Sequence, residues 1–307
     1  MKKQFSKFSE NIRLTESQEN DAKTKYTGVC KTLHKSYYEN EYDGSTKLLF
    51  GSYKTKTNTR PLSEEQDIDV IFKIPEETYE KFKNYEGNGP SALLQEVKEI
   101  LKKTYTTTDE IKGWGKVVLV KFADNTHNVE VLPAFELEDK TFIIPNSENG
   151  GSWDSFNPRE QVDTFQLSNG KTNSLTADLT RMMKTWVKNT PSLNYKSYAL
   201  LNDIMAYLSN NYKNGADYSE YYLVVRDCFH NLYINCDSSQ DSHLATALSR
   251  ANKAVTYFEE DKPKEASLEW RKIFGNEFPL VTENPINESK TRVFTTPSSP
   301  YAYGKIN

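Results

Sequence analysis

The chain has few of the features that mark membrane or secreted proteins. Apolar residues make up 36% of its 307 residues, and no apolar run approaches the roughly 18 residues that a membrane span requires. The N-terminus carries no apolar stretch and no small-residue cleavage site, so we do not expect a secretory signal. The three cysteines, Cys30, Cys228 and Cys236, form no disulfide framework and indicate a reducing compartment. Together these absences predict a cytoplasmic protein with no membrane partner.

A strong charge of either sign is also missing. The chain has 39 Lys and Arg against 43 Asp and Glu, a formal net charge of −4 at pH 7. A protein whose activity depends on coating nucleic acid needs a net basic face, because it must neutralise phosphates. We therefore expect no obligatory nucleic-acid activator. The chain is nevertheless long enough to bury a real core, to which 19 Tyr and 15 Phe contribute bulky mass.

Acidic side chains alternate with apolar ones shortly after a Gly-Ser pair. Gly51 and Ser52 follow one apolar run, and Asp67 and Asp69 lie inside a second. Residues two apart in a strand face the same side, so these carboxylates should project together and repel each other unless a cation lies between them. Mg²⁺ suits such a site, because it takes few carboxylates together with phosphate oxygens. Since Gly51 permits close backbone approach and Ser52 offers a hydroxyl to a phosphate, the pattern predicts nucleotidyl transfer from a nucleoside triphosphate.

A third acid would complete this site. Glu130 is flanked by Val129 and Val131 in a strand-like run. A lone Glu in a strand usually faces solvent, but this apolar-acid-apolar pattern repeats the one around Asp69. We therefore expect Glu130 to join Asp67 and Asp69 as a catalytic, metal-binding set.

A Gly-Ser pair, an Asp-x-Asp and a later single acid together resemble the DNA polymerase β-like nucleotidyltransferase superfamily. Four features narrow the resemblance to bacterial relatives of cGAS and oligoadenylate synthase. These relatives are the cGAS/DncV-like cyclic-oligonucleotide synthases (CD-NTases) of CBASS anti-phage systems. The features are GSYKTKTNTRPL (51–62), VEVLPAF (129–135), RMMKTW with the later YKSYALL (181–201), and EWRKIFGNEFP (269–279).

The resemblance implies an α+β fold. It consists of a polymerase β-like lobe, with a mixed sheet and flanking helices, and a C-terminal helical lobe, with the active site in the cleft between them. The sequence is consistent with this organisation, because strand-like patterns prevail before the Gly- and Ser-rich stretch 146–158 and helical periodicity prevails after it. A capping box at 15–18 opens a long polar helix. We expect a nucleotidyltransferase lobe over 1–150, a helical nucleotide-binding lobe over 151–280 and an extended tail over 281–307.

In the families that the chain resembles, a helical lysine and a later serine contact the donor triphosphate, and the tyrosine beside that serine stacks on the base. Here these positions are Lys184, Ser197 and Tyr198, which would join Gly51 and Ser52 in binding the nucleotide. The chemistry agrees, because an ammonium pairs with phosphate and an aromatic face stacks on any base. Plainer roles are open for each residue: a solvated helix face for Lys184, a helix N-cap for Ser197 and core packing for Tyr198.

The implied activity is Mg²⁺-dependent synthesis of a cyclic di- or trinucleotide second messenger from ribonucleoside triphosphates, with release of pyrophosphate. Two Mg²⁺ ions, or Mn²⁺, would be held by Asp67, Asp69 and Glu130. A downstream effector would sense the product rather than bind this chain. The alternatives are a nucleotidyltransferase that modifies RNA or protein, as a toxin or RNA-tailing enzyme, and a catalytically dead interaction protein. The acidic balance disfavours RNA tailing, and the complete acid set disfavours a dead protein.

Other reactive residues favour structural roles. His127 lies three positions from Glu130, so strand alternation places it on the opposite face and argues against a general base. Four Cys and His residues fall close together, but their spacing matches no zinc pattern, and we expect them to pack within helices. They are Cys228, His230, Cys236 and His243.

Overall fold

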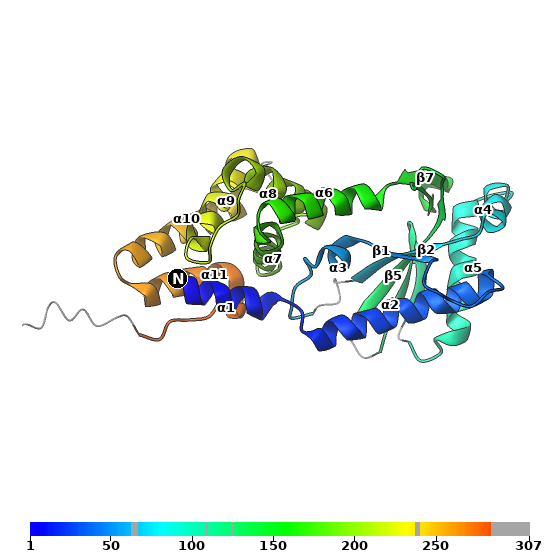
Figure 1. Ribbon diagram of the computed structural model, residues 1–307, viewed down its shortest axis with the longest axis horizontal. Coiled ribbons are helices and arrows are strands. Elements are labelled where there is room, and N and C mark those ends of the chain that lie inside the picture. The colour runs from blue at the N-terminus through cyan, green and yellow to red at the C-terminus, as the bar shows by residue number, and fades with distance from the viewer. Residues whose placement is uncertain (63–66, 109, 124–125, 237–239, 284–307) are drawn as a thin grey trace, which may run out of the picture.

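The computed structural model describes residues 1–62, 67–108, 110–123, 126–236 and 240–283. Figure 1 shows an elongated molecule with a sheet-containing lobe at one end and a helical lobe at the other. Most of the tail expected over 281–307, from residue 284 onward, lies outside the described residues. Among the helices described, none combines the length and the apolar character needed to cross a membrane.

Two neighbouring parallel strands form the centre of the sheet. β2 (Asp67–Lys73) pairs in parallel with β5 (Asn128–Glu136), and antiparallel strands extend the sheet on both sides in the order β1-β2-β5-β4-β3. β6 pairs with the end of β5, and β7 pairs with β6. The other strands are β1 (Lys47–Leu49), β3 (Glu110–Trp114), β4 (Val117–Lys121), β6 (Phe142–Asn146) and β7 (Ser152–Phe156). The mixed sheet confirms the expected α+β class.

Two long helices cover one face of this sheet. α2 (Glu16–Tyr37) begins at the predicted capping box, in which Thr15 accepts from Gln18 N and the Gln18 side chain accepts from Thr15 N. Asn88 is the N-cap of α5 (Gly89–Thr104), and its side chain accepts a hydrogen bond from the backbone N–H of Ser91. Apolar side chains of both helices share one core cluster with β2 and β5. Two shorter helices, α3 (Gly51–Thr55) and α4 (Glu76–Lys83), complete the helices of this lobe.

The central strands are therefore buried on one face and bear acids on the other. Ile68, Val70 and Phe72 of β2 are fully buried in the cluster that α2 and α5 cover. Asp67 and Asp69 alternate with them and are half-buried. Because strand side chains alternate between faces, both aspartates project from the face that the long helices leave uncovered.

The second lobe is a packed group of helices around its own core cluster. At the far end of the molecule α10 packs against both α9 and α11 (Figure 1). The helices are α6 (Pro158–Lys171), α7 (Leu175–Lys188), α8 (Ser197–Asn211), α9 (Tyr221–Asn235), α10 (Asp241–Glu259) and α11 (Pro263–Phe274). All of them lie in the part of the chain from residue 158 onward, where helical periodicity was predicted.

The N-terminal helix belongs to this helical core, although sequence analysis predicted no helix there. Phe5, Phe8 and Ile12 of α1 (Lys2–Ile12) are fully buried in the same cluster as residues of α7, α9 and α11. The boundaries 1–150, 151–280 and 281–307 stay a prediction, but α1 packs with the second lobe rather than with the sheet. The stretch 146–158, expected as a boundary, contains β7, which pairs with β6 across five residues.

Candidate active site

A cavity of about 1080 Å³ lies between the two lobes. The sheet lobe contributes side chains from α3, β2 and β5 to its wall, and the helical lobe contributes side chains from α6, α7 and α8. All of the site residues predicted from the sequence line this one cavity. They are Gly51, Ser52, Asp67, Asp69, Glu130, Lys184, Ser197 and Tyr198.

The parallel register of β2 and β5 brings the three acids together. Asp67 lies opposite Asn128, and Asp69 lies opposite Glu130, so the acids share one face of the sheet. Burial, followed by the charge of Asp67, raises the pKa of Asp69 to about 6. Burial, followed by the charges of both aspartates, raises the pKa of Glu130 to about 7. Burial and the mutual repulsion of the three acids therefore work against their ionisation.

This acid group fits a divalent cation. Burial raises the pKa of Asp67, and its buried Oδ1 has no hydrogen-bond partner. Buried polar atoms are normally satisfied, so an orphaned carboxylate oxygen beside two further acids is where a cation would be stabilised. Within the described ranges no three His, Cys, Asp or Glu side chains converge closely enough to enclose an ion. An open acidic wall of this kind suits Mg²⁺, which usually completes its shell with water and phosphate oxygens.

Gly51 sits directly against one of these acids. Phe50 N donates a 3.2 Å hydrogen bond to Asp69 O, which holds the start of α3 beside β2. Gly51 has a φ of +62°, and a Cβ there would lie 2.1 Å from Asp69 Oδ2. Glycine is thus required both by the backbone conformation and by the close approach. Ser52, the next residue, lines the cavity beside the acids.

Lys184 brings a positive charge from the helical lobe to the same cavity. Its Nζ lies 3.5 Å from Thr57 Oγ1, in the loop that follows α3. Burial lowers the pKa of Lys184 to about 8, although the charge of Asp69 opposes that change. The side chain is half-buried and lines the cavity, unlike a solvated lysine on an outer helix face.

The start of α8 supplies the remaining two predicted residues. Lys196 rather than Ser197 occupies the N-cap position, so the capping role considered for Ser197 is not what the structure shows. Tyr198 is 57% exposed, which rules out core packing for this side chain. Both residues line the cavity on its helical side, where a hydroxyl and an aromatic face are available to a ligand.

The cavity wall also contains residues that were not predicted from the sequence, among them a run of three polar residues after α3. Thr57, Asn58 and Thr59 are buried polar residues that line it directly after α3. The signal was present as a polar run between the Gly-Ser pair and Arg60, inside the segment on which the family resemblance depends. Periodicity could not find them, because their side chains belong to a loop.

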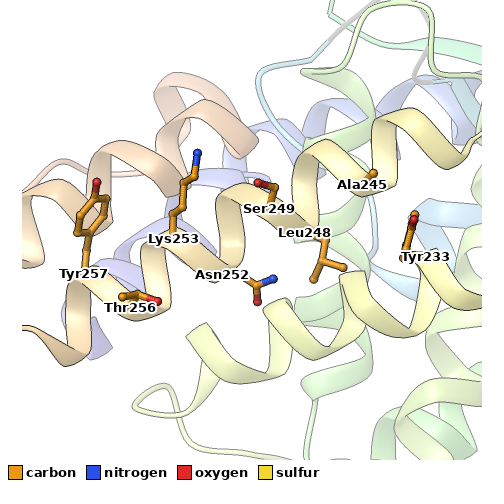
Figure 2. A pocket seen from close by; sticks show the side chains of 8 residues that line it. All are labelled: Tyr233, Ala245, Leu248, Ser249, Asn252, Lys253, Thr256 and Tyr257. Atoms are coloured by element: carbon orange, nitrogen blue, oxygen red, sulfur yellow. The ribbon is translucent and has the colours of Figure 1, made fainter.

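A second cavity of about 580 Å³ lies along α10 and offers different chemistry. Figure 2 shows its lining side chains, all from α10 except Tyr233 on α9. Of the eight residues that line it, Lys253 is the one with a formal charge. The acids, and with them any nucleotidyl-transfer chemistry, belong to the cavity between the lobes.

The remaining residues considered for function have structural surroundings. His127 is buried, and its Nδ1 lies 2.6 Å from Asp21 Oδ2 on α2, away from the cavity that Glu130 lines. Cys228 is fully buried in the helical core, as expected for packing, whereas His230 on the same helix is exposed, so the packing predicted for it was wrong. No metal-binding cluster is found among the described Cys and His residues.

The fold and the acid-lined cavity define the class of a polymerase β-like nucleotidyltransferase. Residues 1–169 match the SMODS family, described as the Second Messenger Oligonucleotide or Dinucleotide Synthetase domain. The chain belongs to this family, which places it among the bacterial cGAS/DncV-like nucleotidyltransferases that make cyclic oligonucleotides.

Relatives and solved structures agree with this class. The "Probable cyclic nucleotide synthase IK1_05630" of Bacillus cereus (strain VD146) is 22% identical, over 78% of this chain and 83% of that protein. E. coli MS115-1 CdnC, solved in complex with HORMA-deltaN, matches with a TM-score of 0.66 and 18% identity, over 90% of this chain and 98% of the matched chain. Vibrio cholerae DncV cyclic AMP-GMP synthase, solved with the linear intermediate 5′ pppA(3′,5′)pG, matches with a TM-score of 0.66 and 14% identity, over 88% and 93%.

Proposed function

We propose that this chain makes a cyclic di- or trinucleotide second messenger in the cytoplasm, from ribonucleoside triphosphates and with Mg²⁺ or Mn²⁺, for anti-phage signalling. The observation that carries the proposal is the convergence of three acids, Ser52 and Lys184 on one cavity. Its volume of about 1080 Å³ exceeds the roughly 300–1,000 Å³ of ordinary small-molecule sites. A donor and an acceptor nucleotide would therefore find room together.

The chain's own residues would bind and orient the donor triphosphate. The Ser52 hydroxyl and the Lys184 ammonium would contact its phosphates from opposite lobes, with Ser197 adding a further hydroxyl. Tyr198, with its exposed ring, would stack on the base. Gly51 leaves space for the phosphates close to Asp69.

The transfer step joins an acceptor hydroxyl to the donor. A ribose hydroxyl oxygen attacks the α-phosphorus, the bond to the β-phosphate breaks, and pyrophosphate leaves while the hydroxyl proton passes to water. Asp67, Asp69 and Glu130 would hold two Mg²⁺ ions, whose charge would lower the pKa of the attacking hydroxyl and stabilise the leaving pyrophosphate. Using the site a second time, after the linear intermediate turns round, would close the ring.

Two relatives support the product class by their names. DncV is named a cyclic AMP-GMP synthase and was solved with a linear dinucleotide intermediate, and the Bacillus cereus relative is named a probable cyclic nucleotide synthase. CdnC was solved with a HORMA protein, which is a direct partner of that enzyme. For this chain we propose that the effector senses the product and does not need to bind the enzyme.

The experiment is an incubation of the purified protein with four labelled ribonucleoside triphosphates and Mg²⁺ or Mn²⁺, followed by phosphatase treatment and separation. A phosphatase-resistant product that the Asp69→Asn variant does not make would support the proposal. Glu138→Gln, which alters an exposed acid beyond the cavity, serves as the matched control and should make the same product. Label transferred to RNA or protein instead would favour the alternative, a nucleotidyltransferase that modifies macromolecules.

A further inference from the structure

The loop after α3 is held by a row of basic side chains on α7. This loop, residues 56–61, forms part of the cavity wall through Thr57, Asn58 and Thr59. Basic residues at positions 181, 184 and 188 of α7 lie on one helix face, because they are three and four positions apart. Each donates to the loop: Arg181 to Lys56 O, Lys184 Nζ to Thr57 Oγ1 at 3.5 Å, and Lys188 Nζ to Pro61 O at 2.6 Å.

Arg181 differs from the two lysines because its guanidinium is also held by a second residue, Asp178, on the same helix. One terminal nitrogen donates to Lys56 O and the other to Asp178 Oδ1. Arg181 and Asp178 are only 5% and 3% exposed, so neither can exchange its partner for water. The planar fork of a guanidinium can serve two acceptors in this way, whereas an ammonium is a single point of charge.

Asp178 is in turn held by several elements of the helical lobe. Its carboxylate accepts from side chains of α1, of the residue directly after α1, of the segment before α9, and of α9 itself. The donors are Ser9 Oγ at 3.1 Å, Arg13, Tyr218 OH at 3.1 Å and Tyr221 OH at 3.1 Å. So many donors hold the Asp178 carboxylate in one orientation. The Arg181 guanidinium, which donates to that carboxylate, is therefore held in one orientation too.

The C-terminal end of the same loop is hydrogen-bonded to α1. Arg60 donates from its guanidinium to Glu10 O at 2.8 Å, and from its backbone to Ile12 O at 3.0 Å. At the near side Lys56 adopts a φ of 54°, a conformation that is uncommon for a residue with a side chain. The hydrogen bond from Arg181 is made to the carbonyl of that residue, where the chain turns from α3 into the loop.

We propose that Arg181 is a positioning residue for nucleotidyl transfer. Held by Asp178, it fixes the loop 56–61 against α7, and so sets the separation between Ser52 on the sheet lobe and Lys184 on the helical lobe. Arg181 does not line the cavity itself, so its effect on the substrate passes through the loop. The inference rests on the proposed function, because it assigns the triphosphate to the space between Ser52 and Lys184.

The decisive variant is Arg181→Lys. It retains a positive charge beside Asp178 but cannot serve Asp178 and Lys56 O with a planar fork. We expect faster amide exchange over residues 56–60 in the ligand-free protein, and a KM for triphosphate about tenfold higher, the order expected for losing one hydrogen bond to a charged group. The kcat should change little, and the thermal midpoint should fall by only a few degrees, because one hydrogen bond is lost while the positive charge beside Asp178 is kept. Arg226→Gln, which removes the arginine of the Arg226–Asp227 pair on α9, is the matched control and should change none of these values.

Two results would overturn the proposal. If Arg181→Lys behaves as the unchanged protein in exchange and in KM, the arginine only neutralises Asp178. If exchange rises across the whole helical lobe and kcat falls with KM, Arg181 only stabilises the fold. Should the unchanged protein release no pyrophosphate from any ribonucleoside triphosphate, the proposed function fails on its own. Loop exchange and the binding of a non-hydrolysable ATP analogue to Arg181→Lys then still decide the role of Arg181.

Discussion

Gly51 and Asp69 lie in such close contact that a Cβ built on Gly51 would stand 2.1 Å from Asp69 Oδ2. Gly51→Ala must therefore displace either the carboxylate or the start of α3, and its φ of +62° adds backbone strain. We expect pyrophosphate release to fall by about 100-fold or more, because small displacements of reacting groups have effects of this order.

The control for that prediction is Gly170→Ala in α6, where an added Cβ meets nothing within 4 Å. Alanine in a helix should leave activity unchanged and raise stability slightly. Full activity in Gly51→Ala, measured beside this control, would show that the contact with Asp69 has no part in catalysis.

Asp69→Asn should remove nucleotidyl transfer by orders of magnitude without unfolding the protein. The raised pKa of Asp69, about 6, means that its ionised form disfavours the folded state at neutral pH. Replacing it with a neutral amide should therefore keep or raise the thermal midpoint measured in EDTA.

The same variant tests whether Mg²⁺ binds at the acids. A ligand that binds only the folded state raises its stability, so millimolar Mg²⁺ should raise the midpoint of the unchanged protein more than that of Asp69→Asn. Glu138→Gln, an exposed acid, should respond as the unchanged protein does. An equal Mg²⁺ response in all three proteins would argue against a cation at the acids.

Lowering the pH should reduce the stability of the fold, because Asp178 becomes protonated. Burial alone would raise the pKa of Asp178, but the charges of Arg181 and Arg13, together with their hydrogen bonds, outweigh burial and hold the pKa below its usual value. A lowered folded-state pKa contributes stability above the unfolded pKa of about 3.9, and that contribution is lost as pH falls through the folded value. Asp178→Asn should thus destabilise the protein at pH 7 by about 3–5 kcal/mol, because it leaves a buried arginine unpaired.

Thermal midpoints between pH 3 and pH 7 would check this. The difference in thermal midpoint between the unchanged protein and Asp178→Asn should become smaller towards pH 3. Asp163→Asn, which changes an exposed position on α6, should have the midpoint of the unchanged protein at every pH. If the difference in midpoint between the unchanged protein and Asp178→Asn stays constant with pH, the charge of Asp178 does not stabilise the fold.

Phe5→Ala should destabilise the helical lobe, since Phe5 is fully buried. Its ring contacts those of Trp270, Phe278 and Tyr221 at centroid distances of 5.3, 5.2 and 6.4 Å. Truncating a buried Phe costs about 3–5 kcal/mol, which urea unfolding would measure. The exposed Lys3→Ala on the same helix should cost almost nothing, and a similar small cost for Phe5→Ala would contradict the assignment of α1 to this core.

The sequence was informative wherever a signal was local. The capping box before α2 and the alternation of Asp67 and Asp69 with apolar residues both depend on neighbours along the chain, and both appear in the structure as expected. Glu130 was matched to this pair because its apolar neighbours repeat the pattern around Asp69, and the parallel register of β2 and β5 places it opposite Asp69 on the same face.

Elements defined by distant partners were harder to predict. α1 was not predicted, although Phe5, Phe8 and Ile12 have the three- and four-residue spacing of one helix face; the rest of the segment is polar, and its packing partners on α7 and α11 lie far along the chain. β7 lies in a Gly- and Ser-rich stretch and is specified mainly by its pairing with β6. The cavity wall at Thr57, Asn58 and Thr59 likewise depends on contacts between the loop and α7, which no period along the chain reveals.

The placement of α1 also bears on biosynthesis. Asn11 donates a hydrogen bond to Glu277 O across 266 positions of the chain, and Phe5 and Phe8 pack on rings near the same end. On the ribosome, the apolar face of α1 can therefore complete its native contacts only after α11 has emerged, long after α1 and α7 are made. Such distant pairing slows folding and prolongs exposure of apolar surface, so the helical lobe should be the last part of the molecule to become resistant to protease during translation.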